Sequence, residues 1–156
     1  MSRREKKDLT ELTRTITILR DQQTQARTNE LVHRERILNV GLYVLLMYRD
    51  IYVLRADMVS TLESWRLKYV ARQMGVLVYE SCDDLTSLLG KDFRHSLATV
   101  EIKEAEFQHF KEICKQLNEF KKDNHELLYN QIRNIVGAHR AQDSVTFLNA
   151  IEAIDP

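Results

Sequence analysis

The feature that most constrains this chain is its shortage of residues that interrupt helices. Proline occurs once, at the last of 156 positions, and glycine occurs four times. Apolar side chains recur at steps of three and four residues, as in an amphipathic helix, and no long stretch alternates apolar with polar residues as a strand would. The sequence therefore predicts an all-α fold, an up-and-down bundle of four to five helices with an additional N-terminal amphipathic helix.

The first predicted helix carries a narrow apolar stripe on a surface that is otherwise polar, which suits packing against a single neighbour. We expect one domain over residues 1–156, because a chain of this length has the size of one domain. Residues 1–28 either belong to the core of that domain or form an appended helix. The apolar side chains of the stripe are those of Leu9, Leu12, Ile16 and Leu19.

Capping and breaking residues predict where the central helices begin and end. A second helix is expected over about residues 29–55, with the broad apolar face of a central helix. Ser60 and Glu63 have the spacing of a capping box, so a third helix is expected to begin there. Gly90 is placed to end it in the left-handed conformation, and residues 91–99 are expected to form a connector of no more than one extra turn.

Aromatic side chains of the second and third helices fall within apolar stripes, so we expect them in the core rather than as platforms for base stacking. They are Tyr43, Tyr48, Tyr52, Trp65 and Tyr69. Three further helices follow residue 100 in this prediction. They are marked by Phe107, Phe110, Cys114 and Leu117, then by Leu127, Leu128, Ile132, Ile135 and Val136, and last by Phe147, Ile151 and Ile154.

Charge and cysteine content exclude several classes of function. Basic and acidic residues number 23 each, so no basic field exists to hold long nucleic acids by counterion release. Cys82 and Cys114 have neither the spacing of a zinc site nor that of a disulfide framework. The longest apolar run, residues 40–48, is about half of a membrane span. We therefore expect a cytoplasmic protein without a membrane partner, which binds any nucleic acid at a small local site.

One segment near the end of the chain combines residue types suited to a reactive site. It reads Arg133, Asn134, Ile135, Val136, Gly137, Ala138, His139, Arg140. An arginine, a polar residue directly after it and a histidine five positions beyond that resemble the signature of the HEPN superfamily. The resemblance covers about residues 60–155 and is closest to small bacterial members that read Arg-Asn, an aliphatic pair and Gly-Ala-His.

This resemblance implies a four- or five-helix bundle that forms a homodimer, with the two signatures facing each other across a cleft. Many members are metal-independent endoribonucleases, often toxins or antiviral effectors, and a toxin implies an antitoxin partner. Other members are inactive, or are nucleotide-binding partners of small nucleotidyltransferases. Members modified by such partners often carry a tyrosine two residues after the histidine, whereas this chain has Ala141 there. The ligand expected from the resemblance is RNA or a nucleotide.

The chemistry of RNA cleavage assigns each residue of the signature a role. His139 is the expected general acid or base, because an imidazole titrates near neutral pH. Arg133 is the expected catalytic cation, which stabilises charge on the phosphate oxygens by paired hydrogen bonds. Asn134 and Arg140 are expected to bind substrate, Asn134 by orienting the histidine or the phosphate and Arg140 by an added phosphate contact. This scheme requires no metal and no cofactor.

Helical geometry leaves two ways to assemble such a site. In one straight helix Arg133 and His139 lie about 120° apart around the axis and about 9 Å apart along it. His139 also falls within the apolar arc of its helix. Either that arc is partly a dimer interface, which brings two copies of His139 together, or Gly137 breaks the helix and turns His139 outward. The structural alternative is that His139 is a buried packing residue and the arginines form salt bridges.

Other polar residues have weaker claims to a role. Glu80, Asp83 and Asp84 surround Cys82 and either orient His139 or Arg133 or form a solvated helix face. Both cysteines are expected to be small buried side chains rather than nucleophiles. The remaining histidines have no spacing typical of metal ligands. They are His33, His95, His109 and His125.

Overall fold

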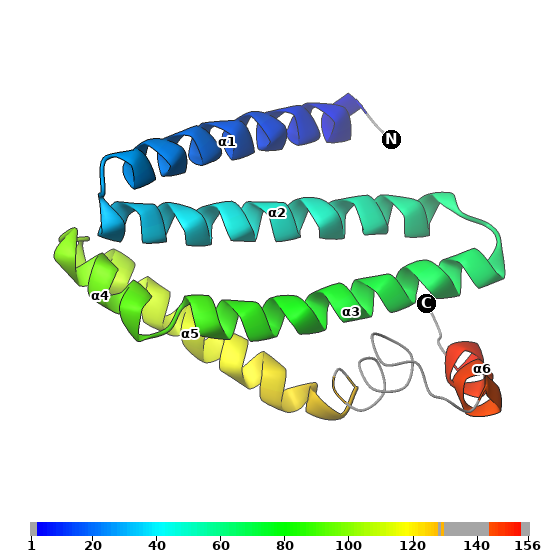
Figure 1. Ribbon diagram of the computed structural model, residues 1–156. Helices are drawn as coiled ribbons and strands as arrows, with labels where there is room; N and C mark the ends of the chain where they lie inside the picture. The colour runs from blue at the N-terminus through cyan, green and yellow to red at the C-terminus, as the bar shows by residue number, and fades with distance from the viewer. Residues whose placement is uncertain (1–2, 128, 130–143, 154–156) are drawn as a thin grey trace. The chain divides into compact units, whose positions relative to one another are not determined.

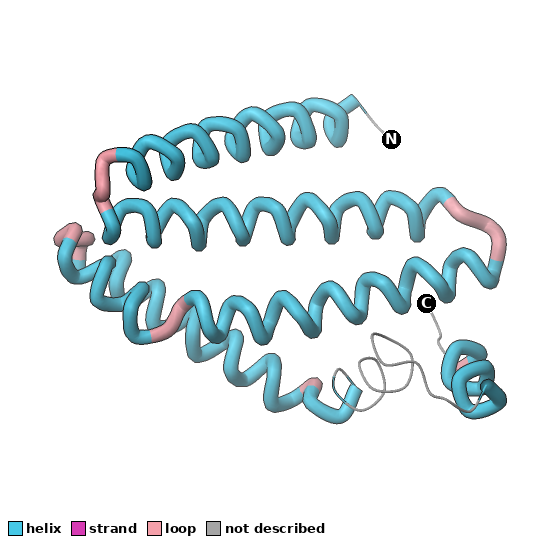
Figure 2. Tube along the Cα trace, viewed as in Figure 1, coloured by secondary structure: helices cyan, strands magenta, loops and turns pink. Residues whose placement is uncertain are grey.

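A computed structural model describes residues 3–127, 129 and 144–153 of the chain (Figure 1). These residues are mainly helical and contain no strand, and short connections join the helices from α1 to α5 (Figure 2). The prediction of an all-α fold is therefore confirmed. The helices are α1 (Arg3–Thr28), α2 (Val32–Ser60), α3 (Ser64–Leu88), α4 (Lys91–Thr99), α5 (Glu104–Asp123) and α6 (Ser144–Glu152).

The chain forms two compact units, each built from segments that are distant in sequence. Unit 1 consists of Met1–Arg49 and Asp84–Leu117, and unit 2 consists of Asp50–Asp83 and Asn118–Pro156. The long helices α2, α3 and α5 each contribute to both units. Neither unit is therefore a continuous piece of sequence.

In unit 1, α1 lies antiparallel to the first part of α2 (Figure 1). The predicted stripe of α1 is half-buried, and a Cβ atom placed on Gly41 of α2 would lie 3.6 Å from Leu19 Cδ1. Polar pairs extend the contact, because Gln23 Nε2 donates to Asn39 Oδ1 at 3.0 Å. The amphipathic prediction for α1 is thus confirmed, and this helix packs within unit 1.

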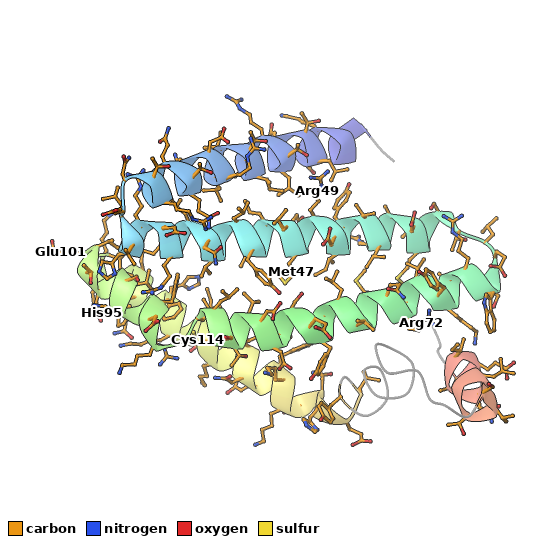
Figure 3. All side chains as sticks on the ribbon, viewed as in Figure 1. Met47, Arg49, Arg72, His95, Glu101 and Cys114 are labelled. Atoms are coloured by element: carbon orange, nitrogen blue, oxygen red, sulfur yellow. The ribbon has the colours of Figure 1, made fainter. Side chains whose placement is uncertain are left out.

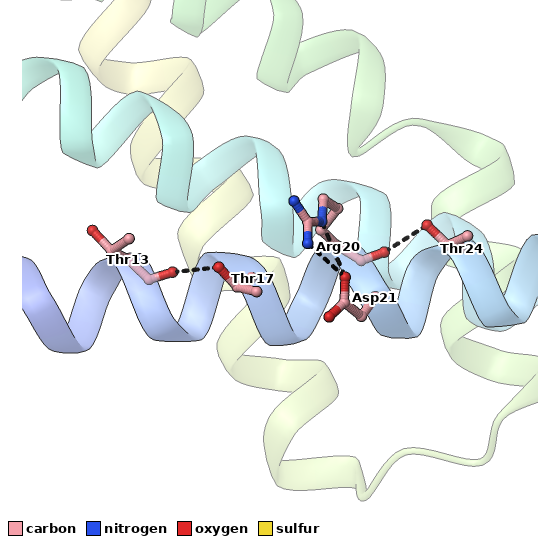
Figure 4. Close-up of polar contacts among 5 residues, drawn as sticks. All are labelled: Thr13, Thr17, Arg20, Asp21 and Thr24. Atoms are coloured by element: carbon pink, nitrogen blue, oxygen red, sulfur yellow. Dashed lines mark hydrogen bonds and ion pairs between the residues drawn. The ribbon is translucent and has the colours of Figure 1, made fainter.

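The outer surface of α1 satisfies many of its polar groups locally (Figure 4). Thr17 Oγ1 donates to the Thr13 carbonyl at 3.0 Å, and Thr24 Oγ1 donates to the Arg20 carbonyl at 2.9 Å. Arg20 also pairs with the neighbouring Asp21 at 2.9 Å. Threonine lowers helix propensity, and hydroxyls bonded to the preceding turn keep these side chains compatible with the helix.

Glutamates, rather than glycines, take the left-handed backbone at two helix ends. Glu30 has φ 56° and Glu101 has φ 52°. After α1 the Leu31 N–H donates to the Ala26 carbonyl at 2.8 Å, which is the long hydrogen bond of a Schellman motif. Hydrogen bonds to the last turn of α1 therefore stabilise a helix end at which the sequence has no glycine.

The predicted left-handed end at Gly90 is wrong. Gly90 has φ −69° and ψ −162°, an extended conformation, and it stands directly before α4 as the N-cap residue. A glycine is still favoured there, because an added Cβ would lie 2.9 Å from the Ser87 carbonyl oxygen. The close approach of the chain to α3, rather than a positive φ, explains this glycine.

The predicted capping box at Ser60 and Glu63 is also wrong, because α2 continues through Ser60. Ser60 Oγ donates to the Asp57 carbonyl in the last turn of α2. Glu63 itself precedes α3, and its carboxylate accepts hydrogen bonds from the Trp65 and Arg66 backbone N–H groups. A carboxylate at a helix N-terminus stabilises free N–H groups and the positive end of the dipole, so one residue performs the role expected of two.

The expected connector at residues 91–99 is the helix α4, which supplies the core of unit 1. Phe93 and Leu97 of α4 are buried against Val40 of α2. The Phe93 ring also lies 5.5 Å from that of Phe110 on α5, at an interplanar angle of 54°. The buried side chains of α4 recur at three- and four-residue spacing, and their burial stabilises this short helix. The sequence interpretation overlooked that spacing.

Unit 2 has a smaller buried core among its described residues. Val70 and Ile151 are each at most 6% exposed. Lys68 Nζ on α3 donates to the Ile151 and Glu152 carbonyls at the end of α6, where a cation complements the helix dipole. These contacts join α3 to α6 within the unit.

The expectation that the aromatic residues are core is wrong for three of the five. Trp65 is 52% exposed and Tyr69 is 51% exposed on α3, and Tyr48 on α2 is 54% exposed. Arg72 lies over the Tyr69 ring, with its Cζ 5.0 Å from the ring centre. Helical periodicity placed these rings on apolar stripes of α2 and α3, but periodicity does not show how far the rest of the chain covers a stripe.

By length and composition, α2 is apolar enough to cross a membrane, and little of it is buried. Arg49 and Asp50 lie near the middle of this helix. Insertion of either side chain at the centre of a bilayer costs about 2.5–3.5 kcal/mol. The same helix also makes the contacts of unit 1 described above. The absence of a membrane partner and the cytoplasmic location stay predictions.

Candidate functional site

The four residues of the predicted site lie outside the described part of the chain. They are Arg133, Asn134, His139 and Arg140. The described residues that precede them in sequence, at the end of α5 and in the turn that follows, line a pocket with α3. All of the described residues that line this pocket belong to unit 2.

The pocket has a volume of about 270 Å³ and combines aromatic, ionic and sulfur-bearing side chains. This volume is slightly below the 300–1,000 Å³ typical of sites for drug-sized ligands, so it suits one flat group rather than a larger molecule. The lining residues are Tyr79, Cys82, Asp83, Lys121, His125 and Tyr129.

Helical spacing places two of these side chains together. Tyr79 stands four residues before Asp83 on α3, and side chains four residues apart on one α-helix lie on the same face. Lys121, His125 and Tyr129 also follow one another at four-residue steps, but α5 ends at Asp123, so His125 and Tyr129 come after that helix. This spacing was readable in the sequence, but nothing there indicated that the two groups of side chains meet.

An ion pair and a group of rings form the walls of the pocket. Lys121 Nζ lies 2.7 Å from Asp83 Oδ1, which fixes α5 to α3. The His125 and Tyr129 rings are stacked, with centres 5.2 Å apart and planes 15° apart. The Tyr79 ring lies 6.1 Å from that of Tyr129 at an angle of 56°. The arrangement offers flat π surface beside a carboxylate that accepts hydrogen bonds.

The cysteines lack the properties of nucleophiles. Burial raises the pKa of the Cys82 thiol above its ordinary value; the Lys121 cation opposes this shift and the Asp83 carboxylate adds to it. Burial likewise raises the pKa of Cys114 on α5, against the effect of Arg94 (Figure 3). Neither thiol is in a disulfide, and both stay protonated at neutral pH; Cys82 is buried and Cys114 is half-buried. The prediction that they are not nucleophiles agrees with this.

The acidic residues around Cys82 make contacts with separate helices. Asp83 pairs with Lys121, as described, whereas Asp84 Oδ2 accepts a hydrogen bond from the Tyr43 hydroxyl at 2.8 Å. Glu80 is exposed and borders a groove between α2 and α3. Two of the three carboxylates thus have structural partners rather than forming one solvated face. Their predicted role toward His139 or Arg133 stays a prediction.

Tertiary structure brings two of the histidines together in unit 1. The His33 and His95 rings, on α2 and α4, have centres 5.2 Å apart in an edge-to-face arrangement. His33 Nδ1 lies 3.2 Å from Oγ of the fully buried Ser96, which also accepts a hydrogen bond from Arg36. Within the described ranges, no group of three or more potential metal ligands occurs. The histidine pair therefore serves packing around Ser96.

No protein-family model matches the chain, and neither a search of curated proteins nor a search of solved structures finds a match.

Proposed function

We propose that the protein is HEPN-like and acts as a metal-independent endoribonuclease of toxin or defence type. His139 is the general acid or base, and Arg133 stabilises the negative charge that develops on the phosphate oxygens. Asn134 orients the histidine or the phosphate, and Arg140 adds a phosphate contact. The substrate is RNA, bound locally because the chain has zero formal net charge.

The observation that carries this proposal is the pocket that precedes the signature. Tyr129 of the pocket stands four residues before Arg133, and four residues of extended chain span at most about 14 Å. An aromatic pocket and a guanidinium within that reach suit a base and a phosphate of the same RNA strand. The all-helical fold and the place of the signature near the end of the chain agree with the same proposal.

Two copies of the chain form the active assembly in this proposal, in which each helical bundle contributes one signature to a shared cleft. Unit 2 carries exposed apolar side chains suited to such an interface. Leu62 is fully exposed and Val59 is 81% exposed, near the half-exposed Trp65 at the start of α3. An exposed tryptophan beside aliphatic residues is typical of the centre of a protein interface.

The test is cleavage of a mixed RNA pool by the full-length protein and by His139→Ala and Arg133→Ala. We expect His139→Ala to lower the cleavage rate about 10²- to 10⁴-fold, the usual contribution of a general acid or base. Arg133→Ala should lower it about 10²- to 10³-fold, the usual loss for one group that stabilises charge in the transition state. Melting temperature and dimerisation should not change. Cleavage should continue in the presence of a metal chelator.

Matched controls exchange the same residue types at exposed positions, in His109→Ala and Arg55→Ala. Both controls should keep the cleavage rate of the original protein. If the original protein cleaves no RNA in any pool, or if the controls lose as much activity as the site variants, the catalytic proposal is wrong.

The exposed apolar surface also supports a second candidate, a non-catalytic interaction module. In that case the segment from Arg133 to His139 is structural, and exposed residues such as Trp65 bind a partner helix. A third candidate, a nucleotide-binding partner of a nucleotidyltransferase, is weakened by Ala141, which stands where modified members carry tyrosine. A stable complex with a second protein, without cleavage, favours the interaction module.

A further inference from the structure

Unit 2 contains a groove of about 580 Å³ between the last part of α2 and α3. These two segments run antiparallel on either side of a short connection (Figure 1). Aliphatic side chains from both helices line the groove: Val53 and Leu54 on α2, and Val76 and Leu77 on α3. Val53 is 50% exposed, so solvent reaches this apolar surface. The volume falls within the roughly 300–1,000 Å³ typical of binding sites.

The groove follows one face of α3 for about three helical turns. Its lining extends from Tyr69 to Glu80, which corresponds to about 17 Å along the helix axis. The α3 residues that line it recur at three- and four-residue steps, as neighbours on one helix face do. Two antiparallel helices leave a groove between them that a third helix fills in a helical bundle. The groove therefore has the length of a short partner helix.

Three polar side chains border the groove without a partner. They are those of Asp50, Gln73 and Glu80, and none of the three forms a side-chain hydrogen bond or ion pair in the described part of the chain. Asp57, which does not line the groove, is by contrast paired with Arg66 at 4.0 Å. Asp50 and Glu80 are also exposed. Two unpaired carboxylates beside an apolar surface attract cationic groups from outside the chain.

These charges select among the molecules that could occupy the groove. The carboxylates repel the phosphates of RNA and of anionic lipids. A second copy that docked through the same groove would bring like charges together, and no cationic side chain is among the described lining residues. An added β-strand would find no sheet edge in the described part of the chain. An amphipathic helix with basic flanks matches the length, the apolar lining and the charge.

We propose that this groove binds an amphipathic α-helix of a partner protein. The apolar stripe of that helix covers the aliphatic side chains of the groove, and its Lys or Arg side chains pair with Asp50 and Glu80. Gln73 can exchange hydrogen bonds with a polar side chain of the same helix. The inference goes beyond the proposed function, because it concerns a protein partner and does not depend on RNA cleavage.

The experiment measures binding of two synthetic helical peptides of about 14 residues to the full chain by calorimetry. Both peptides carry the same leucine stripe at helical spacing; one has lysines on both flanks and the other has glutamates. We expect the lysine peptide to bind at least about tenfold more tightly. This difference should fall below about twofold in about 1 M salt, because salt screens exposed ion pairs. Equal binding of the two peptides at low salt would overturn the proposal.

Charge reversal in the groove tests where the peptide binds. Asp50→Lys combined with Glu80→Lys should reverse the preference, so that the glutamate peptide binds more tightly. Asp8→Lys combined with Glu101→Lys is the matched control, because it makes the same change in net charge at exposed carboxylates of unit 1. The control should keep the preference for the lysine peptide. If the control loses it as well, net charge rather than the groove attracts the peptide, and the proposal is wrong.

The apolar part of the groove is tested at its half-exposed valine. Val53→Asn should weaken the binding of both peptides at least about fivefold, because it removes apolar contact area. Val32→Asn, at a valine of α2 that is 54% exposed in unit 1, should leave peptide binding unchanged. Analytical ultracentrifugation of the same variants measures self-association. If Val53→Asn weakens a homodimer while the lysine peptide does not bind, the groove is an interface between two copies, and the partner proposal fails.

Discussion

The two units of the protein use similar helices for different purposes. Unit 1 surrounds its aliphatic and aromatic core with polar groups that bond to one another, including a fully buried serine hydroxyl. In its described part, unit 2 buries less, carries a fully exposed leucine and a half-exposed tryptophan, and contains the aromatic and ionic pocket.

This difference teaches that the packed core and the accessible pocket belong to separate units. A unit with satisfied polar groups and packed rings resists local opening, whereas exposed apolar groups beside a pocket are available to a ligand or a second copy. We therefore expect substitutions in unit 1 to change mainly stability. Substitutions in unit 2 should change mainly association and binding.

The largest effect is expected in the core of unit 1. Phe93→Ala should lower the free energy of unfolding by about 3–5 kcal/mol, because it leaves a cavity beside Val40 and Phe110. Urea denaturation measures this loss. The matched control is Phe120→Ala, which removes a ring that is 43% exposed in unit 2 and should cost less than about 1 kcal/mol. Equal losses at the two positions would contradict the contrast between the units.

The next effect concerns the exposed surface of unit 2. Trp65→Ala should raise the dissociation constant of the homodimer at least about 30-fold, which corresponds to the 2 kcal/mol typical of a central interface residue. Analytical ultracentrifugation over a range of concentrations measures it. Val32→Ala, at an apolar residue that is 54% exposed in unit 1, should leave the dimer unchanged. A protein that is monomeric at every concentration tested would contradict the dimer proposal.

The smallest effect is expected at the buried hydroxyl of unit 1. Ser96→Ala should cost about 1–2 kcal/mol, because Arg36 loses an acceptor and His33 loses a hydrogen-bond partner, while Arg36 keeps its bond to the Asp92 carbonyl. Thermal and urea unfolding measure the loss. Ser87→Ala, at an exposed serine, should stay within about 0.5 kcal/mol of the original protein. A neutral Ser96→Ala would show that these polar contacts do not stabilise unit 1.

Much of the secondary structure was readable from the sequence, and the errors have identifiable causes. The scarcity of proline and glycine and the helical period predicted α1 and α5 correctly, because those signals are local. The helix ends at Ser60 and Gly90 were wrong, because each cap depends on where the neighbouring helix lies. The helix α4 was overlooked because nine residues form a stable helix only when other parts of the chain pack against them.

The candidate site likewise has one part that could be read from the sequence and one part that could not. The signature from Arg133 to His139 came from the order of residues alone, since a motif is a property of the sequence. The pocket could not be predicted, although Lys121, His125 and Tyr129 have helical spacing. Nothing in that spacing shows that Asp83 and Tyr79 of α3 face the same space. Such a meeting depends on contacts between residues about forty positions apart.

The sequence by itself determined that the chain is helical and where apolar stripes run along α1 and α5. These properties follow from the backbone period and from the chemistry of single side chains. Only the tertiary structure decided that the short α4 completes the core of unit 1, that Trp65 is exposed, and that Asp83 meets Lys121 beside stacked rings. Burial and pairing depend on what lies opposite a side chain, and the opposite residue is distant in sequence.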